Sequence, residues 1–263
     1  SGIPNYLGVP AISPDGSRAW VPSKQDNIKR GTLRNGNNIN FQNTVRGINS
    51  KINLITMAEE YNERMDFDNS GLAGGAIYDK SGNYLFVALE ATREVVIVNA
   101  YSGTELDRIA VGHAPDGLAL SADGNTLFVN NFMDRTISVV DITNVFTRGD
   151  WNPPVVFQLS AVSNEKLAVN VLKGKQLFYD AKDTRLARDG YLSCAVCHND
   201  GAQDGRVWDL TGMGEGLRNT IELRGRSGMA HGLLHRSANF DEVQDFEGQI
   251  RSLASGSGLM TDD

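Results

Sequence analysis

One stretch decides the fold: GLALSADGNTLFV, residues 117–129. Apolar residues alternate with small or polar ones on both sides of Asp123 and Gly124, which predicts two short strands. An aspartate–glycine pair readily adopts the positive φ of a tight hairpin turn. The stretch therefore predicts a β-hairpin, and the β-branched run TISVVD at residues 136–141 predicts a third strand.

The same pattern occurs twice more, as VPAISPDGSRAWV at residues 9–21 and as GAIYDKSGNYLFV at residues 75–87. The turn glycines Gly82 and Gly124 are 42 residues apart, which is the usual length of one propeller blade. Gly16 precedes Gly82 by 66 residues, so we expect an insertion of about 24 residues, placed near residues 27–47. About three blades are predicted, with a third strand of the middle blade at residues 94–99.

The hairpin S-x-D-G-x-x-L-F-V at residues 121–129, followed by ISVVD at 137–141, resembles the YVTN-type (YncE-like) β-propeller family. The resemblance covers about residues 3–157 and implies propeller blades. Three blades cannot close a ring, because propellers have at least about four. Further propeller blades, or another chain, are expected to complete it.

A second motif, CAVCH at residues 194–198, has the pattern of a covalent haem attachment site. In such a site the two thiols add to the haem vinyl groups, and the following histidine binds the iron as proximal ligand. Cys194 and Cys197 are the two cysteines of the chain, and His198 directly follows them. One covalently bound haem c is therefore predicted.

Two other uses of a Cys-x-x-Cys pair are open. A zinc site needs a second pair of ligands, and His231 and His235 stand four residues apart. A redox-active pair normally follows a strand of a βαβ unit, and no such pattern precedes Cys194. Haem attachment is the favoured interpretation.

The pattern changes from strands to helices after Pro154. Apolar residues at helical spacing predict one helix over residues 165–179 and another over residues 241–253. Gly174 and Gly248 are expected to let these two helices approach closely, because glycine has no side chain.

Three segments of this part carry a resemblance to known cytochromes. GKQLF at residues 174–178, ahead of the haem motif, resembles class I cytochrome c. GLRNTIELRG at 216–225 and FDEV at 240–243 resemble segments of bacterial di-haem cytochrome c peroxidases and MauG-like proteins. The resemblance implies a mainly α cytochrome c-like haem domain at residues 158–263, after propeller blades at residues 1–157. One haem motif is present, so di-haem chemistry cannot be completed within this chain.

The residue opposite His198 on the iron would set the chemistry of the haem. His235 is favoured, then His231, because His235 lies where the peroxidase-like segment keeps its histidine. A methionine is the alternative, and the candidates are Met213, Met229 and Met260.

Several further side chains are candidate haem contacts. Guanidinium groups match carboxylates in a bidentate way, which makes arginines candidate partners of the haem propionates. Trp208 would pack on the macrocycle or serve as an ordinary core residue. The candidate arginines of the haem domain are Arg206, Arg218 and Arg224. Arg30, Arg34 and Arg46 of the insertion could approach the propionates or an acidic partner, but a solvated loop is the preferred interpretation of this segment.

A net charge of −7 argues against nucleic acid as a partner. No stretch approaches the roughly 20 apolar residues of a membrane span. Covalent haem attachment belongs outside the cytoplasm in bacteria, so a periplasmic or extracellular location is expected. An export signal is then expected to have been removed or not included, and the chain could be a fragment.

Three functions compete. The favoured one is an exported electron-transfer cytochrome whose propeller docks a redox partner protein through its acidic surface. The second is a peroxidase or MauG-like oxidase, which would need an open iron site served by acid–base groups such as Glu215, Glu222 or His231. The third is a non-redox ligand-binding propeller in which the haem is structural. Whether the chain is an enzyme depends on the sixth iron position.

Overall fold

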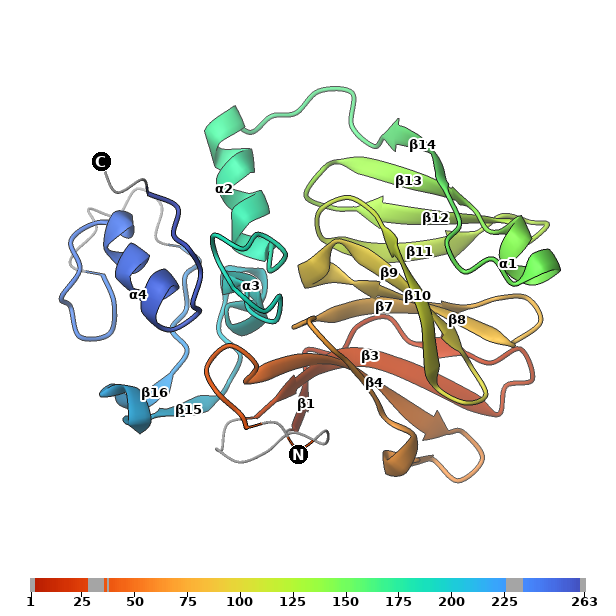
Figure 1. Cartoon of the computed structure of the whole chain (residues 1–263), viewed down its shortest axis with the longest axis horizontal. Helices are drawn as coiled ribbons and strands as arrows, with labels where there is room; N and C mark the ends of the chain where they lie inside the picture. The colour runs from red at the N-terminus through yellow and green to blue at the C-terminus, as the bar shows by residue number, and fades with distance from the viewer. Residues whose placement is uncertain (1–2, 28–35, 37, 226–233, 261–263) are drawn as a thin grey trace.

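Three antiparallel sheets stand side by side in the computed structural model, and a smaller part containing α2, α3 and α4 lies at one side of them (Figure 1). The structure describes residues 3–27, 36, 38–225 and 234–260, and of Met213 the backbone only. We call the sheets blade 1 (residues 3–67), blade 2 (residues 73–110) and blade 3 (residues 115–160). The molecule is mostly β-sheet with few helices, as expected for propeller blades.

Blades 2 and 3 are four-stranded meanders in which each strand pairs with the next along the chain. The predicted hairpins are confirmed, and their turn glycines Gly82 and Gly124 have φ values of 77° and 82°. The predicted third strands coincide with β9 and β13. Blade 2 consists of β7 (Ala73–Tyr78), β8 (Tyr84–Leu89), β9 (Glu94–Asn99) and β10 (Thr104–Ala110), and blade 3 of β11 (Pro115–Leu120), β12 (Thr126–Asn131), β13 (Thr136–Asp141) and β14 (Val155–Ser160). A short helix, α1 (Thr143–Arg148), connects β13 to β14, and β14 extends past the expected boundary at residue 157.

Blade 1 is larger because its two longest strands have nine residues each. These strands pair continuously from Arg18 opposite Asn53 to Asp26 opposite Val45. The predicted insertion therefore lies at residues 27–44, between the strands, and residues 45–47 belong to the sheet because the ladder continues through them. Blade 1 consists of β1 (Ile3–Asn5), β2 (Ala11–Ile12), β3 (Arg18–Asp26), β4 (Val45–Asn53), β5 (Ala58–Glu59) and β6 (Met65–Phe67).

One aromatic position of the repeat is buried between blades 1 and 2 and again between blades 2 and 3. Trp20 of blade 1 is 0% exposed and belongs to the same apolar cluster as Leu85 and Val87 of blade 2. Phe86 of blade 2 is also 0% exposed, and it belongs to the same cluster as Leu127 and Val129 of blade 3. The equivalent residue of blade 3, Phe128, remains partly exposed.

Phe86 and Phe128 offer a matched pair of substitutions. Phe86→Ala is expected to lower the free energy of unfolding by about 3–5 kcal/mol, because it leaves a cavity between two blades. Phe128→Ala is expected to lower it by about 1 kcal/mol or less, because less packing is lost at a partly exposed side chain. Urea unfolding of both variants measures the difference, and equal losses would contradict the assignment of the blade interface.

The chain after blade 3 is less helical than expected. The helices are short: α2 (Val169–Tyr179), α3 (Cys194–Cys197) and α4 (Glu247–Ser252), with a hairpin of β15 (Val207–Leu210) and β16 (Gly216–Asn219) between α3 and α4. Loops make up most of the remainder, so the expectation of a mainly α domain was wrong for the described residues. Tyr179 of α2 packs with Ala195 of α3, and backbone hydrogen bonds such as Arg188 N–H to the Ala254 oxygen hold the loops.

Both predicted helices begin later than expected. α2 starts at Val169 instead of residue 165, because the Glu165 carboxylate accepts hydrogen bonds from Arg135 of blade 3 and from the backbone N–H of Leu167. The second predicted helix is a 3₁₀ turn, η5 (Val243–Phe246), followed by α4.

The expected close approach of the two helices at glycine is also absent. A Cβ added at Gly174 or at Gly248 would meet no atom within 4 Å. In Figure 1, α2 lies beside the blades and α4 lies further from them. The expected contact between these helices was therefore wrong for the described residues.

Candidate haem-attachment site

Cys194 and Cys197 lie at the two ends of α3, a single helical turn. The residues between them anchor the turn: Ala195 is 1% exposed, and Val196 is 0% exposed. Val196 packs in a cluster that includes Leu72, which precedes blade 2. Cys194 is exposed and Cys197 is partly exposed. The buried side chains of Ala195 and Val196 fix the position of the turn.

His198 follows the turn with its ring in a defined tautomer. Its Nδ1 lies 3.0 Å from the backbone oxygen of Ile221 and 3.2 Å from that of Ala202. Carbonyl oxygens only accept hydrogen bonds, so Nδ1 carries the proton and the lone pair is on Nε2. Burial lowers the pKa of His198, which favours the neutral ring. A neutral imidazole held at Nδ1 by a carbonyl is the usual arrangement of a metal-binding histidine.

The surroundings of Cys197 disfavour the thiolate form of its side chain. Although the residue is partly exposed as a whole, burial around its sulfur atom raises the pKa of the Cys197 thiol to about 12, so the thiolate is disfavoured. A thioether sulfur carries neither charge nor proton and tolerates such surroundings. Among the described residues, no group of three or more His, Cys, Asp or Glu side chains is placed to hold a metal ion; His231, part of the zinc alternative, lies outside them.

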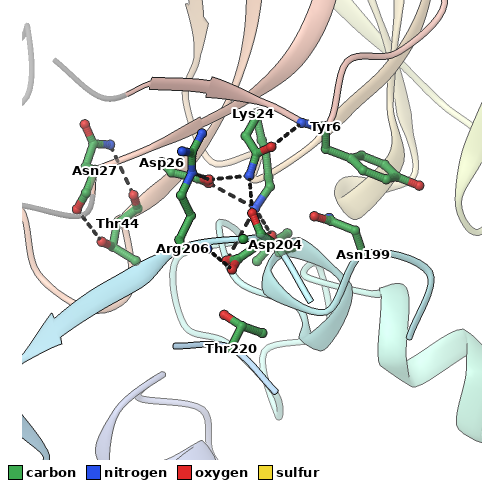
Figure 2. Close-up of polar contacts among 12 residues, drawn as sticks. Tyr6, Lys24, Asp26, Asn27, Thr44, Asn199, Asp204, Arg206 and Thr220 are labelled. Atoms are coloured by element: carbon green, nitrogen blue, oxygen red, sulfur yellow. Dashed lines mark hydrogen bonds and ion pairs between the residues drawn. The ribbon is translucent and has the colours of Figure 1, made fainter. Parts of the chain in front are cut away.

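A buried lysine of blade 1 points toward Asp26 and Asp204 beside the turn (Figure 2). Lys24 of β3, 0% exposed, donates a hydrogen bond of 2.6 Å from Nζ to the backbone oxygen of Val196. The same Nζ lies 3.0 Å from a carboxylate oxygen of Asp26 and 3.8 Å from one of Asp204, and both carboxylate side chains are fully buried. Strand β3 is thereby connected directly to the Cys-x-x-Cys turn.

Further polar groups complete this buried network. Arg206 lies 3.0 Å from Asp26, and the indole N–H of Trp208 donates to Asp204 over 2.9 Å. Two cations and two carboxylates thus balance one another, as buried charges require. Sequence analysis missed Lys24, Asp26 and Asp204, although the unbroken polar run of residues 23–27 within a strand pattern was a usable signal.

The predicted propionate partners are engaged with carboxylates of the chain. Arg206 pairs with Asp26, and Arg218 lies 3.4 Å from Glu215. Arg224 lies 2.8 Å from Glu222. Each guanidinium has five N–H donors, and contact of these arginines with propionates stays a prediction. Arg46 pairs with Asp68. Trp208 packs with Val196 and Cys197 in one apolar cluster. Arg30 and Arg34 lie outside the described residues.

His235, the favoured second iron ligand, has local partners on both ring nitrogens. Its Nδ1 lies 2.8 Å from the side-chain oxygen of Asn239, and its Nε2 lies 3.2 Å from the amide nitrogen of Gln249. The ring also stacks on Phe240 with a centroid distance of 4.8 Å. Iron ligation through Nε2 would therefore require Gln249 to move. Among the other candidates, Met260 is 47% exposed, while His231, Met229 and the side chain of Met213 lie outside the described residues.

A buried carboxyl group, that of Glu90, lies near Asp200, two residues after His198. Glu90 begins the 3₁₀ turn η2 (Glu90–Thr92) after β8 and is 8% exposed. Burial, with smaller contributions from the charges of Asp116 and Asp200, raises the pKa of Glu90 to about 8. The hydroxyl groups of Tyr6 and Tyr179 donate to Asp200 over 2.6 Å and 3.0 Å. Hydrogen bonds thus connect Asp200, two residues after His198, to blade 1 through Tyr6 and to α2 through Tyr179.

Glu90 should make stability depend on pH. Between about pH 5 and pH 8 the folded protein keeps this carboxyl protonated, whereas the unfolded chain releases the proton near the ordinary pKa of 4.5. The free energy of unfolding is therefore expected to fall with rising pH by roughly 1.4 kcal/mol per pH unit from this group, and to level off above about pH 8. Urea unfolding across this range measures the slope.

Glu90→Gln should remove this slope, because glutamine cannot ionise. Glu63→Gln, at a side chain that is 49% exposed, is the matched control and should keep the slope. A wild-type slope that survives in Glu90→Gln would assign the pH dependence to other groups.

Comparison with known proteins finds no match among family models and none among curated proteins. Solved structures of β-propeller-like folds are similar at low identity. Hydrazine synthase from Kuenenia stuttgartiensis is 15% identical over 52% of this chain and 45% of that chain, with a TM-score of 0.43. A putative 6-phosphogluconolactonase from Bacteroides uniformis is 13% identical over 63% and 45%, with a TM-score of 0.44.

The Dos1 propeller is 9% identical over 60% of this chain and 34% of that chain, with a TM-score of 0.43. The match with this chain spans less than half the length of each of these structures. Within the described residues, no helix has the length and apolar character needed to cross a membrane.

Proposed function

We propose that this chain is an exported electron-transfer protein that carries one haem c on Cys194 and Cys197, with His198 as proximal ligand. The observation that supports this most directly is the hydrogen bond from His198 Nδ1 to the Ile221 carbonyl, which leaves Nε2 available for iron. Because bacterial haem c is attached outside the cytoplasm, the proposal places the protein in the periplasm or outside the cell.

The residues around the turn would keep the attachment site in one orientation. Lys24 holds the Val196 carbonyl, while Ala195 and Val196 are packed from behind. The Ile221 and Ala202 carbonyls fix the direction of the His198 ring. When bound, the haem would supply a reversible one-electron couple. A rigid site of this kind suits electron transfer, and the blades would serve as the docking surface for a redox partner protein.

The second candidate is a peroxidase-like oxidoreductase. It gains support from the contact between His235 Nε2 and Gln249, because a histidine engaged in this way leaves the opposite iron position open. The electron carrier requires that position to be filled, for which His235 remains our proposal. A structural haem in a ligand-binding propeller is the third candidate.

The test is to produce the chain in bacteria that export it and attach haem. Haem should migrate with the polypeptide on a denaturing gel and resist extraction by acidified acetone. Complete extraction of the haem, or no haem at all, would overturn the proposal.

Carbon monoxide then separates the candidate functions. An electron carrier with both axial positions filled should show an unchanged spectrum when carbon monoxide is added to the reduced protein. Ready binding would favour the peroxidase-like candidate. A haem that cannot be reduced and reoxidised reversibly would favour a structural role.

A further inference from the structure

The charge of Lys24 lies against the peptide group that joins Val196 to Cys197. Lys24 Nζ donates a hydrogen bond of 2.6 Å to the Val196 oxygen, and that oxygen belongs to the peptide bond before Cys197. In the proposed function, Cys197 carries the haem through a thioether bond, and His198 follows it as the iron ligand. The ammonium group of blade 1 is therefore one peptide group away from a residue that would hold the haem.

Lys24 belongs to a set of ionised side chains from which water is largely excluded. We call Lys24, Asp26, Asp204 and Arg206 the buried charge group. The side chains of the first three residues are 0% exposed, and that of Arg206 is 21% exposed. Trp208, which donates to Asp204, packs in the apolar cluster of the turn. Charges act strongly over short distances when little water lies between them, and salt screens them much less.

The buried charge group contains two cations and two carboxylates, which Figure 2 shows pointing toward one another. Reduction of a haem iron adds one negative charge. A nearby buried cation therefore favours the reduced iron, and a nearby buried carboxylate favours the oxidised iron. Removal of Lys24 or of the Asp204 charge would break the balance in opposite directions.

We infer that the buried charge group sets the reduction potential of the haem on the adjacent turn, with the charge of Lys24 favouring the reduced iron. The inference rests on the proposed function, because it requires haem on Cys197. Lys24 also acts as a positioning residue, through its hydrogen bond to Val196. Blade 1 would then have a second role besides docking a partner, since two of the four charges belong to its strand β3.

A redox titration of the full chain with haem attached, followed by its absorption spectrum, measures the potential. Lys24→Met should lower the equilibrium constant for reduction at least about tenfold, which corresponds to about 59 mV for one electron. Asp204→Asn should raise this constant, and asparagine keeps an oxygen that can accept the Trp208 N–H. The absorption bands should stay in place in both variants, because neither change removes an iron ligand.

Two further variants separate charge from packing. Lys24→Met combined with Asp204→Asn balances the remaining charges again, so its potential should return close to the wild-type value. Lys51→Met is the matched control, because Lys51 is also a lysine of blade 1 with a side chain only 10% exposed. Its Nζ lies 3.5 Å from Glu60 and over the ring of Trp20. Lys51→Met should leave the potential unchanged.

Unchanged potentials in Lys24→Met and Asp204→Asn, with covalent haem present, would overturn the inference and leave the proposed function standing. An equal shift in Lys51→Met would also overturn it, because the position of the charge would then not matter. If Lys24→Met does not fold or its absorption bands move, Asp204→Asn decides: a raised potential with bands in place supports the inference, and any other result overturns it. A wild-type chain without covalent haem would overturn the proposed function and this inference with it.

Discussion

Replacing both Cys194 and Cys197 by serine is expected to abolish covalent haem attachment completely. Serine has no thiol to add to a vinyl group, so any haem that still binds would be held by non-covalent contacts alone. Because the turn is anchored by Ala195 and Val196, which are 1% and 0% exposed, the fold should survive the change. Haem staining of a denaturing gel measures the loss, and far-ultraviolet circular dichroism confirms that the chain is folded.

Single substitutions and a surface control make this result specific. Cys194→Ser and Cys197→Ser should each retain haem through one remaining thioether bond. Val207→Ser, at an exposed position of β15, should retain haem at the wild-type level. Covalent haem in the double variant would show that haem is attached at other residues. A wild-type protein without covalent haem would refute the proposed function.

Lys24→Met is expected to lower the free energy of unfolding by about 3–5 kcal/mol. The substitution leaves the fully buried carboxylate of Asp204 without its cation, and Asp26 is left with Arg206 alone. Burying an unpaired charge costs much more than the loss of one ordinary hydrogen bond. Urea unfolding of the chain with and without the substitution measures the effect.

The double variant Lys24→Met with Asp204→Asn tests the reason for this loss. Removing the unpaired carboxylate should restore part of the lost stability, since a neutral amide is cheaper to bury than an ionised group. Arg206→Met is the matched control and should lose less, because the Arg206 side chain is 21% exposed. A loss of less than about 1 kcal/mol in Lys24→Met would mean that the network contributes little to folding.

The network also connects blade 1 to the Cys194–His198 segment. Lys24 and Val196 are 172 positions apart in the chain, yet they share a hydrogen bond of 2.6 Å. The carbonyl that Lys24 binds belongs to the turn between the two cysteines. The position of the Cys-x-x-Cys turn therefore depends on the folding of the first blade.

Local patterns in the sequence predicted the blades well. The hairpins, the strands β9 and β13, and the 42-residue spacing of the repeat follow from alternation and turn glycines, which act over a few residues. Helix starts were predicted less well. The chain at Glu165 is held out of the helix by Arg135, which lies 30 residues away and which no local pattern indicates.

The sequence by itself determined the β-blade repeat and the Cys194–His198 motif, because both depend on residues close together in the chain. Only the tertiary structure decided which charges meet at Lys24, which hydrogen bonds orient the His198 ring, and which groups raise the pKa of Glu90. It also decided that Phe86 is buried while Phe128 is partly exposed, although the repeat makes them equivalent. The reason is physical: burial and ion pairing depend on segments that packing brings together from distant parts of the chain. The spacing of these segments in the sequence does not indicate which of them will be in contact.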